Sequence, residues 1–362
     1  MSKFHKLKVS AVKNEIAEAV SVSFDVPESF KANFNYLPGQ YTTLKLHING
    51  ESVNRSYSFC SSPFANEPLT IAVKRVEGGK GSNFINDNFR AGVEVEVMEP
   101  MGNFHSVMAE SNEKHYVLFG GGSGITPVMA ILKSVLIKEP KSKVTLFYGN
   151  RNENTIIFKD KLAELEAQSA GRLKVVHVLD AAVGTWSGPT GPIVKDVALK
   201  LLRENTNLNF QHAEFFICGP TPMMKSVEEA LGLLGIPKDK VHIEYFTAKA
   251  DEDKKAADVG TTVESAVPFT GKTKVKIIYD GHEREFEVSE KETILEAALD
   301  AGYDPPYSCM VAACCTCRAK LLSGKVEMDD RESLTDAEIA KGYVLTCQSH
   351  PKSHGIVLNY DM

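Results

Sequence analysis

Residues 307–317 read YSCMVAACCTC and place four cysteines within nine positions of a 362-residue chain that has seven. The spacing from Cys309 is C-x4-C-x2-C, through Cys314 and Cys317, and Cys347 follows after 29 intervening residues. Three thiolates from one tight loop and a fourth from a remote strand can surround two irons, and this spacing is the plant-type 2Fe-2S pattern. The sequence therefore predicts Cys309, Cys314, Cys317 and Cys347 as metal ligands, with Cys315 as a spare.

Two other interpretations of the cysteines are open. Cys314 and Cys317, together with Cys347 and His350, also fit the spacing of a zinc knuckle, but that set leaves Cys309 without a role. A cluster of inert buried cysteines is less favoured, because free cysteines rarely gather at this density. The 2Fe-2S interpretation is the one that uses the whole pattern.

The surrounding residues resemble those of the plant-type ferredoxin family, which has a β-grasp fold. The resemblance covers residues 272–362 and rests on three segments: PPYSC (305–309), LLSGKVEM (321–328) and YVLTCQSHP (343–351). The family usually has a basic residue at the position of Met310 and glycine at the positions of Ala312 and Cys315. These departures bear on the backbone of the loop and on the potential of the cluster.

Composition limits the classes of function. The chain has 43% hydrophobic and 24% charged residues, and its net charge of −6 gives no electrostatic basis for binding nucleic acid. No run approaches the ~18 apolar residues of a membrane span, and the N-terminus has no apolar signal region. We therefore expect a cytoplasmic protein with no membrane partner, whose cysteines stay reduced and bind metal.

Pattern along the chain predicts a multidomain α+β and α/β protein. Short β-like runs separated by turn signals predict an antiparallel β-barrel at 1–108, and alternating strands and helices predict a parallel α/β sheet at 109–249. Residues 250–271 are polar and without periodicity, as in a linker. The hairpin KVKIIYD-GHE-REFEVSE and the helix TILEAALDAG open the ferredoxin-like domain, 272–362.

Two segments of the first domain have the chemistry of a flavin site. In RSYSFCSSP (55–63), Arg55 offers a forked donor for phosphate, Tyr57 a flat surface and Ser58 a hydroxyl near flavin N5. In VKRVEGGKGSNF (73–84), a glycine-rich turn opens a helix that can hold a pyrophosphate. Each alone also fits an ordinary strand and loop. Together they resemble the ferredoxin–NADP reductase superfamily and imply bound FAD, in preference to FMN, at Arg55, Ser56, Tyr57, Ser58, Val73, Lys74, Arg75, Gly81, Ser82 and Asn83.

The second domain carries two candidate nicotinamide segments. FGGGSGITP (119–127) lies between an apolar strand and a helix, the context of a phosphate-binding loop, and CGPTPMM (218–224) follows a second such strand. The superfamily resemblance places Thr126, Cys218, Gly219 and Pro220 near the nicotinamide ring, although Cys218 also fits a small buried hydrophobe.

Three further residues have weaker signals. Arg151 follows the second strand of the sheet, where an arginine accommodates the 2′-phosphate of NADPH, so NADPH is favoured over NADH, although a surface arginine fits nearly as well. Glu244 occupies the superfamily's C-terminal position of contact with the flavin. Phe246 either covers the flavin ring or is a core residue.

The three motifs together imply a path for electrons. A flavin mediates between the two-electron donor NAD(P)H and a one-electron 2Fe-2S centre, while the protein positions the cofactors. Ser58 is at most a hydrogen-bonding group at N5.

The order of the domains resembles that of reductase components of multicomponent oxygenases. Within those, the likeness is to phenylacetyl-CoA epoxidase reductase subunits and similar ring-hydroxylating system reductases. Residues 272–362 hold 11 Lys and Arg against 16 Asp and Glu, a net charge of −5, which is consistent either with docking to a basic partner or with a solvated acidic face. Alternatives are a free-standing NAD(P)H oxidase or ferric reductase, a flavin reductase with a zinc-stabilised binding module, and a nonenzymatic nucleotide sensor.

Overall fold

The computed structural model describes residues 4–207, 209–246, 256–260 and 271–362. The chain divides into two compact units, one formed chiefly by residues 5–245 and the other chiefly by residues 246–362. Each unit is described by itself.

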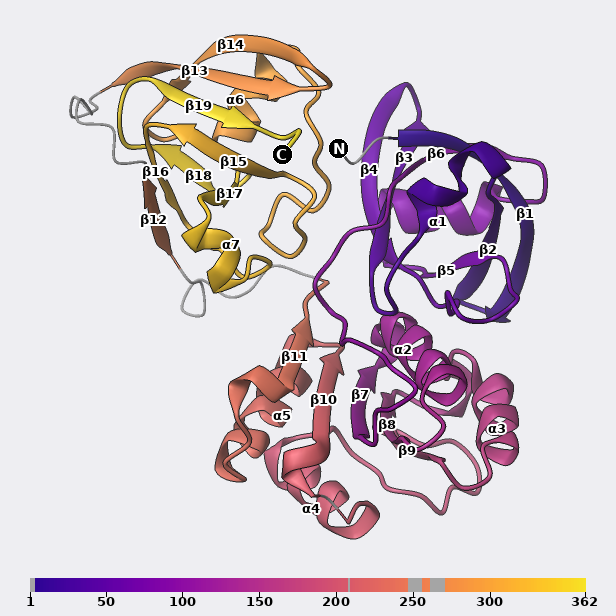
Figure 1. Cartoon of the computed structure of the whole chain (residues 1–362). Helices are drawn as coiled ribbons and strands as arrows, with labels where there is room; N and C mark the ends of the chain where they lie inside the picture. The colour runs from indigo at the N-terminus through magenta and orange to yellow at the C-terminus, as the bar shows by residue number, and fades with distance from the viewer. Residues whose placement is uncertain (1–3, 208, 247–255, 261–270) are drawn as a thin grey trace. The chain divides into compact units, whose positions relative to one another are not determined.

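The first part of the larger unit is a six-stranded antiparallel sheet with the strand order β4-β3-β6-β1-β2-β5 (Figure 1). An antiparallel bridge between Phe59 and Ile71 joins the ends of the two outer strands and closes the sheet into the predicted barrel. Its core includes the fully buried Leu7, Val22 and Leu44. The elements are β1 (Phe4–Ile16), β2 (Ala19–Asp25), η1 (Glu28–Phe34), β3 (Tyr41–Ile48), β4 (Glu51–Ser58), β5 (Leu69–Lys74), α1 (Lys80–Asn88) and β6 (Glu94–Met98).

The second part of the larger unit is a five-stranded parallel sheet with the order β11-β10-β7-β8-β9. Figure 1 shows α2 and α3 on one face of the sheet and α4 and α5 on the other. The chain leaves β7 towards β8 on one side and returns to β10 on the other, so a crevice is expected at the carboxyl ends of β7 and β10. The main elements are β7 (His115–Gly121), α2 (Ile125–Lys138), β8 (Lys143–Asn150), α3 (Lys159–Gln168), β9 (Leu173–Leu179), α4 (Lys195–Asn205), β10 (Ala213–Cys218), α5 (Thr221–Leu233) and β11 (Val241–Glu244).

Four short 3-10 helices complete this part. They are η2 (Gly122–Gly124), η3 (Glu153–Thr155), η4 (Phe210–His212) and η5 (Lys238–Lys240). η2 matters most, because it connects the glycine-rich end of β7 directly to α2.

The smaller unit has a mixed five-stranded sheet with the order β14-β13-β19-β15-β17, in which β13 and β19 run parallel. The predicted hairpin forms, and its turn residues Asp280 and Gly281 both have positive φ, as a tight two-residue turn requires. The predicted helix also forms, with Thr293 and Glu296 as a capping box. The elements are β13 (Lys272–Tyr279), β14 (His282–Ser289), α6 (Ile294–Asp300), β15 (Arg318–Ser323), β16 (Lys325–Met328), α7 (Asp336–Ala340), β17 (Tyr343–Leu345), β18 (Ser349–Pro351) and β19 (Ile356–Asn359). The β-grasp expectation is confirmed.

The predicted linker contains a strand. Residues 257–260 form β12 (Ala257–Gly260), which pairs antiparallel with β16 in a three-stranded sheet, β12-β16-β18. Val259 is buried in this pairing. The expectation of an irregular tether therefore does not hold at these four residues, and the rest of 250–271 lies largely outside the described residues.

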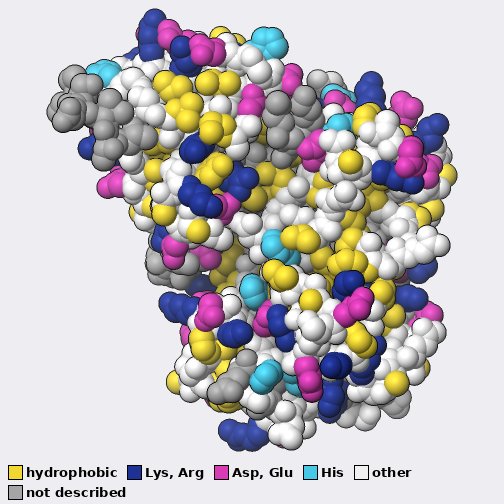
Figure 2. Space-filling view, in the orientation of Figure 1, with side chains coloured by type: hydrophobic (Ala, Val, Ile, Leu, Met, Phe, Trp, Pro, Cys, Tyr) yellow, Lys and Arg dark blue, Asp and Glu magenta, His cyan; other side chains and the backbone are white. Residues whose placement is uncertain are grey.

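Many acidic side chains of the smaller unit are paired within it. Lys274 bonds Glu285 at 3.0 Å, Lys276 bonds Glu283 at 2.8 Å and Lys352 contacts Glu327 at 2.5 Å. Figure 2 shows Lys and Arg side chains among the acidic ones on the visible face of this unit. These pairs reduce the field that the excess acidity would otherwise present to a basic partner.

We expect Val259→Asp to destabilise the smaller unit, because it buries an unpaired carboxylate in the β12–β16 pairing. The loss is at least about 2 kcal/mol, which lowers the melting temperature of this unit by about 10 °C. Thermal unfolding followed by the visible absorbance of the smaller unit measures it. Asp258→Asn, at an exposed position of the same strand, is the control and should change little. An unchanged melting temperature for Val259→Asp would mean that β12 contributes nothing to this unit.

Candidate functional site

The four predicted ligand cysteines lie together in two pairs. The thiols of Cys309 and Cys314 are hydrogen-bonded to each other, and so are those of Cys317 and Cys347. The bond from Cys309 lowers the pKa of the Cys314 thiol to about 6, and the bond from Cys317 lowers the pKa of Cys347. A cluster of two irons takes two thiolates on each iron, so this donor set fits a 2Fe-2S group.

The loop backbone turns its amides towards sulfur. The sulfur of Cys309 accepts N–H groups from Val311 at 3.4 Å and from Cys314 at 3.3 Å. Met310 and Ala312 have φ of 59° and 56°, the left-handed region, which costs each residue on the order of 1–2 kcal/mol. The loop therefore adopts a backbone conformation that favours glycine although Ala312 is not glycine. Other contacts of the loop must offset the free energy that this conformation costs.

Two side chains beside the ligands were not predicted. Gln348 donates its amide to the carbonyls of Cys347 at 2.8 Å and Met310 at 3.3 Å, and lies 3.6 Å from the Cys347 sulfur. The Thr316 hydroxyl lies 3.3 Å from the Cys314 sulfur. Polar groups at these distances tune a cluster's potential. The only sign of these two residues in the sequence is that each is next to a predicted ligand cysteine. That adjacency does not show whether the side chain points towards the sulfur atoms.

The alternative zinc interpretation requires His350 as a ligand together with Cys314, Cys317 and Cys347, but His350 has another partner. Nε2 of His350 is 3.0 Å from a carboxylate oxygen of Asp329, on the neighbouring strand end. Cys309, which has no role in a zinc knuckle, is hydrogen-bonded to Cys314. The four cysteines therefore lie together, whereas the His350 imidazole is paired with Asp329.

The segment RSYSFCSSP begins within β4, and this strand ends at Ser58. Ser58 is buried, and within the described residues its hydroxyl has no hydrogen-bond partner, as expected of a group reserved for a ligand. Tyr57 is half-buried and packs against the barrel core. Arg55 is exposed, and its guanidinium donates to the carbonyl of Asn54 at 2.7 Å. Ser56, between Arg55 and Tyr57 on the same strand, is half-buried.

The helix after the glycine-rich turn offers backbone donors. No side chain caps the N-terminus of α1, so the N–H groups of its first turn, including those of the buried Gly81 and Ser82, lack intrahelical acceptors. Asn83 differs from the expectation. Its backbone N–H is bonded to the Gly79 carbonyl at 3.3 Å and its side chain to the Val76 carbonyl at 3.1 Å. Gly81 and Ser82 fit a pyrophosphate, whereas Asn83 holds the turn.

The three predicted residues at the end of β5 face different surroundings. Val73 is a core residue of the barrel. Arg75 forms an ion pair with Asp87 of α1 at 2.6 Å, which raises the pKa of its guanidinium. Lys74 lines the cleft of the parallel sheet, where burial and the charge of Arg151 lower its pKa. The structure therefore brings Lys74 to the nucleotide side.

The two predicted nicotinamide segments touch through their backbones. A Cβ on Gly124 would lie 2.1 Å from the Cys218 carbonyl oxygen, and one on Gly121 would lie 2.5 Å from Pro220. Thr126, in the first turn of α2, donates its hydroxyl to the Ser123 carbonyl at 3.1 Å. The glycines are needed because the turn after β7 passes against the end of β10.

A cleft of about 370 Å³ opens at the carboxyl ends of the parallel strands. Asn150, the last residue of β8, lines this cleft and is largely buried there. Lys74 and Arg151 bring two positive charges and Asp180 one negative charge. The lining residues are Lys74, Gly121, Gly122, Gly149, Asn150, Arg151, Asp180, Pro192, Ile193, Val194, Pro220, Pro222, Met223 and Ser226. Cleft and donors fit a nicotinamide dinucleotide.

The end of β10 is buried. Cys218 is fully buried, and burial together with the charge of Glu244 raises the pKa of its thiol well above the usual value. Glu244 lies opposite Cys218 in the strand register. Phe246 is 41% exposed, so its interpretation as a core residue is wrong.

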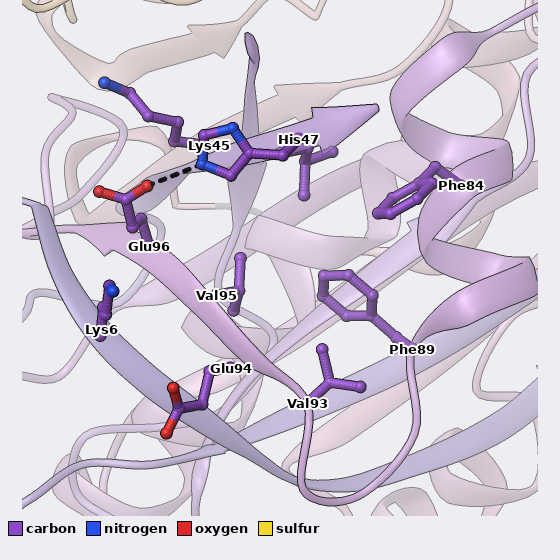
Figure 3. A pocket seen from close by; sticks show the side chains of 10 residues that line it. Lys6, Lys45, His47, Phe84, Phe89, Val93, Glu94, Val95 and Glu96 are labelled. Atoms are coloured by element: carbon purple, nitrogen blue, oxygen red, sulfur yellow. Dashed lines mark hydrogen bonds and ion pairs between the residues drawn. The ribbon is translucent and has the colours of Figure 1, made fainter. Parts of the chain in front are cut away.

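A second hollow of about 340 Å³ lies on the barrel, and Phe84 is the one residue of the flavin segments among those that line it (Figure 3). Phe84 and Phe89 form one wall, and His47 and Glu96 pair at 3.1 Å on the opposite side. Two lysines and two glutamates line it together, so their formal charges cancel. Nothing in this lining selects a ligand.

Three family models match consecutive parts of the chain. The oxidoreductase FAD-binding domain matches residues 6–106, the oxidoreductase NAD-binding domain residues 118–229, and the 2Fe-2S iron-sulfur cluster binding domain residues 277–352. With these matches, bound FAD, NAD(P)H and a 2Fe-2S cluster are the cofactors of the chain, and the zinc alternative falls. Among the described residues, no helix is long and apolar enough to cross a membrane.

Characterised relatives match over nearly the whole length. The chain is 35% identical over 362 residues to a component of the 1,2-phenylacetyl-CoA epoxidase of Escherichia coli (strain K12), covering 100% of this chain and 99% of that protein. It is 36% identical to the 3-ketosteroid-9-alpha-monooxygenase ferredoxin reductase component of Rhodococcus rhodochrous, covering 98% and 96%. The fold matches that of phthalate dioxygenase reductase with a TM-score of 0.56 at 23% identity, covering 98% of both chains.

We expect Gly124→Ala to impair the nucleotide half selectively, because the new methyl group meets the backbone of Cys218 and Gly219, which cannot move aside as a flexible side chain can. The rate of FAD reduction by NAD(P)H should fall by about 100-fold or more, since small misplacements near the reacting atoms carry that cost. Stopped-flow flavin absorbance measures it, and the visible spectrum of the 2Fe-2S group should be unchanged.

Gly232→Ala provides the matched control. Gly232 lies in α5 with nothing within 4 Å of its added Cβ, so the substitution should stabilise the helix by roughly 0.5–1 kcal/mol and leave the rate unchanged. A wild-type rate in Gly124→Ala would contradict the close passage of the two turns.

Proposed function

The chain belongs to the FAD- and 2Fe-2S-containing reductase components of oxygenases, which pass electrons from NAD(P)H to an oxygenase, and from this premise we propose a substrate system and residue roles. The proposed partner is an oxygenase that acts on an aromatic acyl-CoA thioester. The full-length similarity to the 1,2-phenylacetyl-CoA epoxidase component carries this proposal. The ketosteroid system of the second relative is the other candidate substrate class.

The proposed roles follow the geometry of the chain's own side chains. When bound, the three groups supply a two-electron donor, a carrier of one or two electrons, and a one-electron carrier. Cys309, Cys314, Cys317 and Cys347 hold the irons. Arg55, Tyr57, Ser58, Gly81 and Ser82 hold FAD, and the Ser58 hydroxyl is the hydrogen-bonding group at N5. Thr126, Cys218, Gly219 and Pro220 border the nicotinamide.

We also propose that NADPH is the preferred nucleotide. Arg151 follows the strand next to the glycine-rich turn, where the 2′-substituent of the ribose is read, and it has no ion pair among the described residues. Lys74 adds a second positive charge to the same cleft. Asp180 favours the opposite choice, because a carboxylate there suits the free hydroxyl of NADH.

The proposed compartment is the cytoplasm. All seven cysteines are free thiols, and four of them are the cluster ligands proposed above. A reducing compartment keeps such thiols available to iron.

The partner proposal is tested with purified oxygenases. Electron delivery to an epoxidase acting on an aromatic acyl-CoA should be rapid, and delivery to unrelated acceptors slow. Equal rates with ferric chelates, dyes and the oxygenase would favour a free-standing oxidase or ferric reductase.

Cys347→Ser tests the ligand assignment. Because one ligand of the four is replaced, the 2Fe-2S absorbance and iron content should fall to near zero, while FAD reduction by NAD(P)H persists within about twofold, as expected of separately folded modules. Cys315→Ser is the matched control and should keep the cluster. Loss of the cluster in Cys315→Ser, or its retention in Cys347→Ser, would contradict the assignment.

Arg151→Ala tests the nucleotide preference. Loss of a charge-assisted contact with a phosphate, about 1.5–3 kcal/mol, should raise the KM for NADPH about 10- to 100-fold and leave that for NADH unchanged. Steady-state reduction of a dye with each nucleotide measures it, with the exposed Arg203→Ala as the control. An equal rise of the KM for NADPH and NADH would indicate that Arg151 contacts a part of the molecule that both nucleotides share. A rise for NADH alone in Asp180→Ala would favour NADH.

A further inference from the structure

Lys133 of α2 reaches from the nucleotide half to the flavin barrel. Its ammonium lies 2.5 Å from a carboxylate oxygen of Glu67 and donates to the carbonyl of Cys60 at 3.1 Å. Only 12% of the Lys133 side chain is exposed. In the sequence Lys133 is only a charge that interrupts an apolar run, and neither the flavin motif nor the nicotinamide motif gives it a role.

The surrounding bonds make this contact a clamp of fixed geometry. The Glu67 oxygen that meets Lys133 also accepts the backbone N–H of Ser62 at 2.6 Å. The hydroxyls of Ser62 and Ser134 bond each other at 2.7 Å, and both side chains are buried. Two neighbouring residues of α2, Lys133 and Ser134, thus hold the barrel at three polar contacts, two to the segment 60–62 and one to Glu67.

The clamp joins the two elements that face the cofactors. Cys60 is two residues beyond Ser58, at the end of the flavin strand. Lys133 is seven residues beyond Thr126 on one unbroken helix, about 10 Å along its axis. Cys60 also shares a continuous apolar core with Ile125, Val128 and Leu132 of α2. Any slip at the clamp therefore moves the turn before α2 relative to the end of β4.

Stability alone does not explain a buried charge at this place. Removing the largely buried Lys133 ammonium from water costs free energy, whereas the Glu67 side chain stays 31% exposed. A well-packed apolar side chain in place of such a buried charge often serves stability as well or better. What an ion pair with shared hydrogen bonds adds is a defined direction and length. The Lys133–Glu67 pair is therefore suited to fixing position.

We propose that Lys133 is a positioning residue for hydride transfer. Together with Glu67 and Ser62 it sets the distance between the nicotinamide-binding turn and the end of the flavin strand. The inference rests on the transfer of a hydride, two electrons with one proton, from NAD(P)H to FAD. It does not rest on which nucleotide is preferred.

The test compares Lys133→Met with a Lys133→Met/Glu67→Leu double variant in the full-length protein. The single variant leaves Glu67 without its ion-pair partner and should lose rate, with only a small loss of stability because the Glu67 side chain is 31% exposed. The double variant removes both charges and should regain wild-type melting temperature. In both variants the limiting rate of FAD reduction at saturating nucleotide should be at least ~10-fold below wild type, whereas the nucleotide Kd should change less than ~2-fold. The nucleotide that reduces the wild type faster is used, so an error in the proposed preference leaves the test intact.

Hydrogen exchange supplies a readout that does not depend on turnover. With no nucleotide added, the amide of Ser62 and its neighbours in 59–62 should exchange faster in both variants, since their anchor on α2 is gone. Lys133→Arg, which keeps the charge and the donors, should restore protection and most of the rate.

Lys138→Met is the matched control on the same helix. Lys138 pairs with Glu110 at 3.3 Å at the surface and should behave as wild type. The proposal is overturned if Lys133→Met has a wild-type limiting rate, or if the double variant recovers both stability and rate. A change confined to nucleotide Kd would also overturn it, because that would make Lys133 a binding residue.

Discussion

The nucleotide half depends on two backbone turns passing at contact distance. The turn after β7 lies so close to the end of β10 that no side chain fits at Gly124, and Gly121 meets Pro220 in the same way. The strand order places these two ends side by side, and the chain enters α2 directly from the contact. Gly121 and Gly122 of the first turn and Pro220 of the second thereby line the same cleft, which a bulkier turn would fill. The binding site therefore follows from the absence of side chains at a few positions.

The cluster loop shows the opposite solution, with side chains where glycine is usual. Met310 and Ala312 are held in the left-handed region, and the amides around them point at the sulfur of Cys309. The strain is offset by the hydrogen bonds of the loop, including the one from Gln348 to the Met310 carbonyl. Binding of iron by the four thiols would stabilise this conformation further, since metal binding is coupled to the folding of its loop.

Local patterns predicted a large part of this molecule. The cysteine spacing, the Asp280–Gly281 hairpin and the alternation of strands with helices are short-range signals, and each appears in the structure. Tertiary contacts were not predictable in the same way. β12 is too short to show periodicity and forms only because β16 offers an edge. The helix α4 was not anticipated at all. Lys74 and Arg75 are adjacent in sequence, yet Lys74 lines the cleft of the parallel sheet and Arg75 forms an ion pair with Asp87. Their surroundings differ because they depend on residues that are distant in the sequence.

The added strand has a consequence for anyone who dissects the protein. A fragment that starts at residue 272, where the sequence places the ferredoxin domain, would lack β12 and leave the backbone of β16 unpaired along one side. Exposed edges of this kind recruit other chains and favour aggregation. A fragment intended to remain monomeric in isolation should begin upstream of Ala257, so that β12 pairs with the otherwise open edge of β16.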